Sequence, residues 1–195
     1  ARTMQVFGLD KTYLKDTMEG VGSRYYDDEG NCFAETGRGP RNFGFAKRQF
    51  FFQPELEAAL RDVSAQTSPG TLHFGAEVTD VRNGPDHALV TVQDADGHSH
   101  QIRTQWVLAC DGGRSPIRER LGIPMSGNTY EEDWIVVDTM NDPDPTLYSK
   151  FFCSGARPTV SVPAPHGGRR YEFMLQPGET REQVLQDGFL KDLMT

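Results

Sequence analysis

Cysteine, basic residues and long apolar runs are all scarce in this sequence. Its 195 residues include only three cysteines, Cys32, Cys110 and Cys153, whose odd number and wide spacing form neither a metal-binding pattern nor a disulfide framework. Such cysteine usage fits a reducing compartment, so we expect a cytoplasmic protein. The 28 acidic residues outnumber the 20 basic ones, and a net charge of -8 disfavours a nucleic-acid partner, which needs a basic surface. No run approaches the roughly 20 apolar residues of a membrane span, and we expect no export signal.

What is present is a globular composition with helices expected at both ends. Apolar residues make up 36% and charged residues 25%, a balance that does not read as disordered. Residues 1–7 read as a helix already under way with Gly8 as its stop, and residues 180–193 as a helix with a capping box of Thr180 and Gln183. Little chain remains for these helices to pack on, so we expect a segment of a larger protein. The alternative is a compact natural domain with frayed ends.

The elements between these helices predict an α/β fold that grades into α+β. Gln53-Pro54 marks a helix start, because Pro is favoured in the first helical turn. The nearly continuous apolar run 106–110 predicts a strand buried on both faces, as in a parallel sheet with an inserted antiparallel ribbon. The other predicted strands are 23–26, 32–35, 71–74, 78–82, 88–93, 99–103, 134–138 and 169–176, with connections at 142–145 and 158–168. The last two strands look like the start of a second, antiparallel sheet.

The sharpest local feature is the corner Asp111-Gly112-Gly113, which follows the apolar run and precedes a short helix capped by Ser115. In open α/β sheets, ligands bind beyond the carboxyl ends of the strands, and the free amides of a helix start favour phosphate. Asp111 can accept hydrogen bonds from hydroxyls, and Arg114 or Arg118 can meet phosphate oxygens. The alternative is an ordinary strand–turn–helix, in which Asp-Gly is common.

Two further positions are candidate ligand contacts. Gln53 opens its helix after three aromatic residues and could reach a ligand, although a solvated Gln in the first turn is the alternative. Val78 lies in a predicted strand where its backbone could face an adenine edge, and core packing is the alternative. We expect no metal site and no serine nucleophile, since HExxH, G-x-S-x-G and GxxxxGK[ST] are absent, and Cys110 reads as a buried, inert thiol.

The ordered stretch from Val107 to Arg118, continued by Leu121-Gly122-Ile123, resembles the Asp-Gly motif of FAD-dependent aromatic hydroxylases, the group typified by para-hydroxybenzoate hydroxylase. Further stretches are similar to the subgroup that hydroxylates 3-(3-hydroxyphenyl)propionate and 3-hydroxycinnamate: Arg2-Thr3-Met4-Gln5, Phe52-Gln53-Pro54, Trp134-Ile135-Val136-Val137-Asp138 and residues 169–180. The resemblance runs across nearly the whole chain.

This resemblance implies a two-domain flavoprotein. Residues 1–125 would be the central part of a Rossmann-like, GR2-type FAD-binding domain with an antiparallel meander and a substrate-domain excursion at about 20–50. Residues 126–195 would be part of an antiparallel substrate-binding domain. The implied reaction hydroxylates a phenolic small molecule with O2, FAD as cofactor and NADH or NADPH as reductant. Because the flavin carries the chemistry, no catalytic side chain is assigned.

The resemblance also implies residue roles. Asp111 and Gly112 would lie by the FAD pyrophosphate and ribityl region, Arg118 would support that loop, Gln53 would contact the ribityl chain, and the Val78 backbone would face adenine. Tyr171 and Phe173 alternate on one strand and could line the substrate face. Glu172 and Met174 occupy the other face of that strand, and periodicity does not say which face looks at the flavin.

Two motifs of the family are absent, the GxGxxG fingerprint and a downstream Gly-Asp motif. We therefore expect that the 195 residues alone neither retain FAD tightly nor hydroxylate a phenol. Two alternatives to a segment of a 3-hydroxyphenyl-acid hydroxylase stay open. One is a related hydroxylase with another phenolic substrate. The other is a non-catalytic association domain, whose open sheet edges would favour a homo-oligomer.

Overall fold

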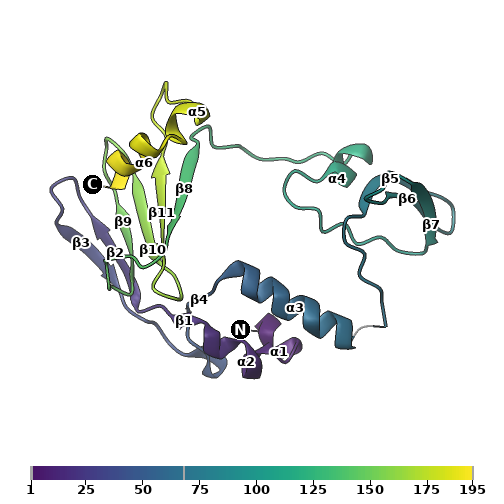
Figure 1. The fold of residues 1–195 in the computed structure, drawn as a ribbon, viewed down its shortest axis with the longest axis horizontal. Helices are drawn as coiled ribbons and strands as arrows, with labels where there is room; N and C mark the ends of the chain where they lie inside the picture. Colours follow the sequence, from purple (N-terminus) through teal and green to yellow (C-terminus); the bar gives the residue numbers. More distant parts are fainter. Residues whose placement is uncertain (1, 68, 195) are drawn as a thin grey trace. The chain divides into compact units, whose positions relative to one another are not determined.

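The computed structural model describes residues 2–67 and 69–194, which form two compact units. The first unit combines residues 2–67 with 131–194, and the second is residues 69–130 (Figure 1). The second unit is therefore inserted in the sequence between the two parts of the first. The expected assignment of 1–125 and 126–195 to two functional domains stays a prediction.

A six-stranded mixed sheet is the frame of the first unit. Strand β2 (Gly22–Tyr26) pairs in parallel with β9 (Tyr148–Phe152), and all other neighbours are antiparallel. The β2–β3 hairpin forms as predicted, because the Asp27 carboxylate accepts the backbone amides of Glu29 and Asn31 across the turn. In spatial order the strands are β3 (Cys32–Thr36), β2 (Gly22–Tyr26), β9 (Tyr148–Phe152), β10 (Thr159–Pro163), β11 (Arg169–Met174) and β8 (Trp134–Thr139).

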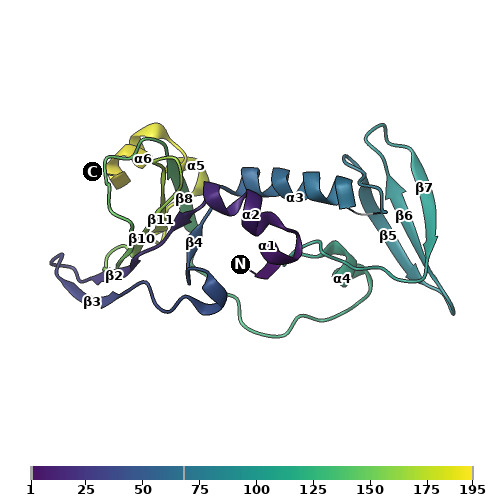
Figure 2. The ribbon, with the colours of Figure 1, turned by 90° about the horizontal axis from the view of Figure 1, so that it is seen from below.

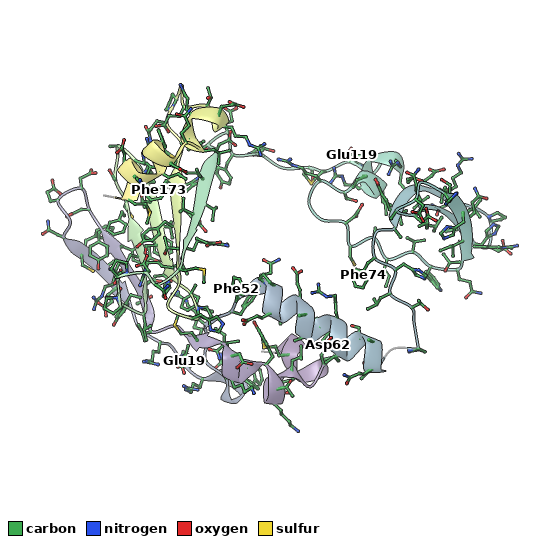
Figure 3. The ribbon with its side chains drawn as sticks, viewed as in Figure 1. Glu19, Phe52, Asp62, Phe74, Glu119 and Phe173 are labelled. Atoms are coloured by element: carbon green, nitrogen blue, oxygen red, sulfur yellow. The ribbon has the colours of Figure 1, made fainter. Side chains whose placement is uncertain are left out.

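Two short helices, α5 (Arg181–Val184) and α6 (Asp187–Met194), pack on one face of this sheet (Figure 1). Phe173, Ile135 and Val184 form the buried core between sheet and helices, and Figure 3 shows Phe173 on the sheet beside α6. The predicted capping box of Thr180 and Gln183 is present at α5. The single helix predicted over 180–193 is two helices, because Asp187 and Gly188 suit a helix interior poorly and the second helix begins at Asp187.

The other end of the first unit carries its longest described helix, α3 (Gln53–Thr67), which starts at Gln53 as predicted. Helix α1 (Arg2–Val6) ends as predicted before Gly8, which adopts a left-handed φ of 69°; Ala1 lies outside the described residues. Both α1 and α2 lie beside α3 (Figure 2). The remaining elements are α1 (Arg2–Val6), α2 (Leu9–Thr12), the 3-10 turns η1 (Leu14–Asp16) and η2 (Asn42–Gly44), and a small sheet of β1 (Met18–Glu19) and β4 (Gln49–Phe50).

The second unit is a three-stranded antiparallel meander with one short helix. Its strands are β5 (Glu77–Asn83), β6 (Ala88–Gln93) and β7 (Ser99–Thr104), and its helix is α4 (Pro116–Arg120). Strand β6 alternates buried and half-buried residues, so one face of the meander forms a core. Val81, Val90, Val92 and Ile117 make up that core. The hairpin predicted from residues 88–103 is confirmed.

Three predicted elements are wrong. Residues 71–74 form no strand, and Leu72 and Phe74 stay 51% and 74% exposed. Residues 106–110 also lie outside any sheet. In the described part of the chain no strand runs beside this segment to supply hydrogen bonds or cover its side chains, so Leu108 is 90% exposed and Cys110 is exposed rather than buried. Residues 158–168 contain β10, because their prolines flank the strand and Pro163 is its last residue.

The fold class is confirmed as mixed α/β, with one mixed sheet and antiparallel sheets. The predicted parallel pairing occurs elsewhere than expected, between β2 and β9 and not around residues 106–110. Among the residues that the structure describes, no helix has the length and apolar character needed to cross a membrane.

Candidate functional site

The corner at Asp111 is held together by its own side chains. The Ser115 hydroxyl donates to Asp111 Oδ1 at 2.6 Å, and the Ile117 amide donates to Asp111 Oδ2 at 3.1 Å. Ser115 Oγ in turn accepts the Arg118 amide at 3.0 Å, which makes Ser115 the predicted cap of α4. Gly112 has a φ of 83°, a conformation that glycine adopts without strain. The corner is therefore a fixed local structure.

Asp111 is an exposed carboxylate whose pKa is lowered by its neighbours. Its hydrogen bonds from the Ser115 hydroxyl and then from the Ile117 amide lower the pKa of Asp111 below its usual value, and the Arg118 charge acts in the same direction. Two oxygens of an ionised carboxylate offer about four lone-pair directions. After the two internal bonds, Asp111 can still accept hydrogen bonds from a ligand.

The expected free amides at the start of α4 are not available for phosphate. The Ile117 amide is taken by Asp111, and the Arg118 amide is taken by Ser115. The Asp111 carboxylate and the Ser115 hydroxyl therefore compete with any bound anion for these two amide donors. The expectation that free amides at this helix start would favour phosphate is therefore wrong for the Ile117 and Arg118 amides.

Arg118 lies across the corner. Its Nη1 donates to the Gly113 carbonyl at 2.8 Å, and its Nη2 contacts Glu119 Oε1 at 3.1 Å. Its side chain is 22% exposed. Arg118 thus holds the glycine loop by its backbone, whereas Arg114 is an exposed residue of the same loop. Figure 3 labels Glu119 on α4, next to this arginine in sequence.

Val78 and the corner share one core. Ile117, the residue whose amide binds Asp111, is one of the buried side chains of the meander core, and Val78 packs against the same cluster. Val78 pairs with Val92 at a register shift of the β5–β6 ladder, on a strand at the edge of its sheet. The structure therefore brings the predicted site residues Val78 and Asp111 into one unit.

Gln53 lies in the other unit, at the first turn of α3. Its side-chain amide donates to Glu57 Oε1 at 2.8 Å. The turn before it is fixed by the buried Tyr13, whose hydroxyl donates to the Phe52 carbonyl at 3.0 Å. His166, in the β10–β11 turn, contacts Glu55 Oε1 at 3.1 Å. Sequence reasoning missed both anchors, because each joins segments far apart in the chain.

Tyr171 and Phe173 lie on the sheet face that α5 and α6 cover. Phe173 is 4% exposed and contacts the core described above, and Tyr171 packs at the edge of the same cluster. The Tyr171 hydroxyl donates to Asp142 at 3.1 Å. Burial of the phenol and then the negative charge of Asp142 raise the pKa of Tyr171. Their place at a substrate stays a prediction, which the burial of Phe173 disfavours.

Neither α5 nor α6 covers the opposite face of the sheet. The ladder register places five residues in one row across this face, from β8 through β11, β10 and β9 to β2. We call this row the Glu172 face; it consists of Val136, Glu172, Val160, Phe151 and Tyr25. The alternation of residues along β11 placed Glu172 and Phe173 on different faces of the sheet. Only the packing of α5 and α6 shows which of the two faces is covered.

Comparison with known proteins places this architecture in a family. A family model described as an FAD binding domain matches residues 1–193. The 3-(3-hydroxy-phenyl)propionate/3-hydroxycinnamic acid hydroxylase of Shigella sonnei (strain Ss046) is 34% identical over 194 residues, which is 100% of this chain and 35% of that enzyme. The enzyme of the same name from Escherichia coli (strain K12) gives the same identity and coverage. The chain thus spans about a third of the length of the curated relatives it matches.

Solved structures share the fold at low sequence identity. The p-nitrophenol 4-monooxygenase PnpA from Pseudomonas putida DLL-E4 has a TM-score of 0.82 at 17% identity, over 94% of this chain and 47% of that one. The flavin-dependent monooxygenase PieE, solved with FAD and substrate, has a TM-score of 0.81 at 15% identity, over 98% of this chain and 37% of that one. Family model, relatives and fold agree with the resemblance read from the Asp111 motif, and this chain belongs to the FAD binding domain family.

Proposed function

We propose that this chain is a segment of a longer FAD-dependent monooxygenase that hydroxylates a phenolic ring with NADH or NADPH and O2. The observation that carries the proposal is the fixed Asp111 corner, in a chain whose family is defined by FAD binding. The chain spans 35% of its hydroxylase relatives, so the activity belongs to the longer protein.

The corner fits part of such a cofactor. Asp111 is an exposed, ionised acceptor, which suits the hydroxyls of a ribityl chain. Beside Gly112 and Gly113, a first side-chain carbon would meet no other heavy atom within 4 Å, so a ligand can approach the backbone there. Both features match a site for the polar, sugar-like part of FAD.

The residues that would hold FAD act as acceptors and supports. Asp111 and Gly112 would lie against the pyrophosphate and ribityl region, and Arg118 would keep the loop in place through Gly113. The Val78 backbone would face adenine, and the Gln53 amide would exchange its bond to Glu57 for one to the ribityl chain. When bound, FAD would supply the redox chemistry, taking electrons from the reduced nicotinamide and activating O2.

The first substrate to test follows from the relatives. Their names specify 3-(3-hydroxyphenyl)propionate and 3-hydroxycinnamic acid, and we propose a 3-substituted phenol of this kind. The longer protein should contain FAD in stoichiometric amount, measured by absorbance, and should consume NADH or NADPH in step with appearance of a second ring hydroxyl. A purified, refolded protein that retains no flavin absorbance after it is mixed with FAD and desalted would overturn the proposal.

A pair of variants tests the corner itself. Asp111→Ala should weaken FAD binding about tenfold to a hundredfold, because a hydrogen bond to a charged acceptor contributes about 1.5–3 kcal/mol. Asp111→Asn, which keeps an acceptor oxygen, should weaken it less. Asp96→Ala is the matched control, since Asp96 is an exposed aspartate in the β6–β7 turn of the same unit. Equal FAD affinity in D111A and D96A would contradict the assignment.

The 195-residue chain by itself is expected to behave differently. We infer that it neither retains FAD tightly nor hydroxylates a phenol, because it has no GxGxxG fingerprint to bind the pyrophosphate. Mixing the chain with FAD, desalting it and recording the absorbance tests this inference. A stoichiometric flavin spectrum after desalting would contradict it.

One observation favours the alternative of a non-catalytic association domain. Strand β3 ends the six-stranded sheet and is exposed at all five positions, so its unpaired edge could join another chain. This alternative predicts a defined oligomer without ligand in size-exclusion chromatography. A monomer at high concentration would exclude it.

A further inference from the structure

The six-stranded sheet has two chemically different faces. One face carries Phe173 and Ile135 and is packed against α5 and α6. The Glu172 face has neither helix on it, and at its β8 edge Val136 remains 50% exposed and the neighbouring Trp134 43% exposed. Near Ser23 the same face is closed off by Arg48, which donates to the Ser23 hydroxyl. The accessible part of this side of the sheet therefore lies at its β8 edge, and the half-buried Glu172 is on the strand next to that edge.

This row is apolar and aromatic except for one side chain. Val136 and Val160 lie directly opposite Glu172 on its two neighbouring strands. Next along the row, the rings of Phe151 and Tyr25 stack with centroids 4.9 Å apart and planes 14° apart. Flat apolar surface of this kind favours contact with another aromatic ring. Glu172 is the single charged residue in the row.

Within the described residues the Glu172 carboxylate forms no hydrogen bond or ion pair, although the Arg170 charge acts on it from the same face. Arg170 is itself engaged by another carboxylate. Arg170 donates from Nε and Nη2 to the two oxygens of Asp138 at 2.8 and 2.9 Å. That hydrogen bond raises the pKa of Arg170, and the charge of Glu172 adds to the effect. A half-buried acceptor thus remains unused in an apolar surface.

We propose that the Glu172 face binds the ring of the phenolic substrate and that Glu172 accepts the hydrogen bond of its hydroxyl. This inference rests on the proposed function. A phenol offers an apolar ring and one donor, and the face offers an apolar surface and one acceptor. Because two carboxylates repel each other, a substrate with an acidic side chain lies with its hydroxyl at Glu172 and its carboxylate directed away.

The test compares a phenol with its methyl ether, which keeps the ring but cannot donate. In the longer, FAD-containing protein, 3-(3-hydroxyphenyl)propionate and 3-(3-methoxyphenyl)propionate are titrated and their dissociation constants read from the flavin absorbance. The wild-type protein should prefer the phenol by about tenfold to a hundredfold, the range of a hydrogen bond to a charged group. Glu172→Leu should abolish this preference, and Glu172→Gln, which keeps an acceptor oxygen, should retain part of it.

Glu29→Leu is the control, since Glu29 lies exposed in the β2–β3 turn of the same sheet. It should keep the full preference. FAD content and thermal melting show whether each variant is folded, and E172Q carries the test if E172L is not. A preference for the phenol that survives unchanged in the folded Glu172 variants overturns the assignment while leaving the proposed function intact. A wild-type protein that binds no FAD overturns both.

Discussion

Replacement of Arg169 by methionine should destabilise the first unit far more than replacement of its sequence neighbour. Arg169 is 2% exposed. Its Nη1 donates to Ser161 Oγ at 3.0 Å, and its Nε and Nη2 lie 3.5 Å from carboxylate oxygens of Asp142 and Asp144. Its Nη2 also donates to the Thr146 carbonyl. One side chain thereby fixes the 140–147 connection to the sheet.

The magnitude follows from the groups that would lose their partner. The Asp142 side chain is 4% exposed, and Arg169 is its ion-pair partner among the described residues. Removing one member of a buried pair costs about 3–5 kcal/mol. Asp144 keeps Lys150 at 2.6 Å, and the Tyr171 hydroxyl still donates to Asp142. We therefore expect a loss near 3 kcal/mol, at the lower end of that range.

Arg170→Met is the matched control, because Arg170 is the next residue on β11 and faces the other way. Its bond to Asp138 joins side chains that are 48% and 61% exposed, and such surface pairs contribute about 0–1 kcal/mol. Urea unfolding is followed by Trp134 fluorescence in a Trp106→Phe background, so that the signal reports on the first unit. The reasoning would be refuted if R169M and R170M differed by less than about 0.5 kcal/mol in unfolding free energy.

Three further predictions concern the cap, the acidic network and the core. Ser115→Ala should lower the unfolding free energy of the second unit by about 1 kcal/mol, because α4 loses its cap, and Ser115→Thr should largely restore it in urea titrations followed by circular dichroism. The pKa of Asp144 is about 2: burial raises it, but the bonds from Lys150 and Thr146 and the charge of Arg169 outweigh that effect. Because the folded-state pKa is lowered, the ionised Asp144 stabilises the protein fully above pH 3.8, and this stabilisation is lost as the pH falls toward 2. Between pH 3.8 and 2 the urea midpoint of the wild type should therefore drop more steeply than that of Asp144→Asn. Parallel pH profiles of the two proteins would contradict this. Phe173→Ala should cost about 3–5 kcal/mol, whereas Val136→Ala, at a half-exposed position of the other face, should cost less than about 1 kcal/mol; equal thermal shifts would show that the helix-covered core is not the stabilising one.

The parts of the fold that sequence predicted well depend on neighbouring residues. The caps at Ser115 and Thr180, the glycine stop at Gly8 and the hairpin turn at Asp27 each use groups within a few positions of one another. Their hydrogen bonds join groups that are close in the sequence, so the local residue pattern is enough to predict them. The Asp111 corner belongs to the same class, which is why its outline could be predicted without a structure.

The parts that could not be predicted depend on what lies alongside. The run 106–110 has the composition of a buried strand, but a strand needs a neighbour, and within the described residues none flanks it. The alternation of Tyr171, Glu172 and Phe173 defines two faces without saying which one a helix covers. Burial of Arg169 gave no local signal either, because its partners lie on another strand and in a distant connection.

The parallel pairing of β2 with β9 has a consequence for the order in which the protein is made. Tyr26 is synthesised long before its neighbour Phe152, and the whole of unit 69–130 leaves the ribosome in between. Roughly 120 residues at a typical elongation rate correspond to about 6–25 s. Throughout that interval the nascent β2–β3 hairpin keeps the β2 edge and the ring of Tyr25 uncovered, so during synthesis this hairpin is open to mispairing and to chaperone capture.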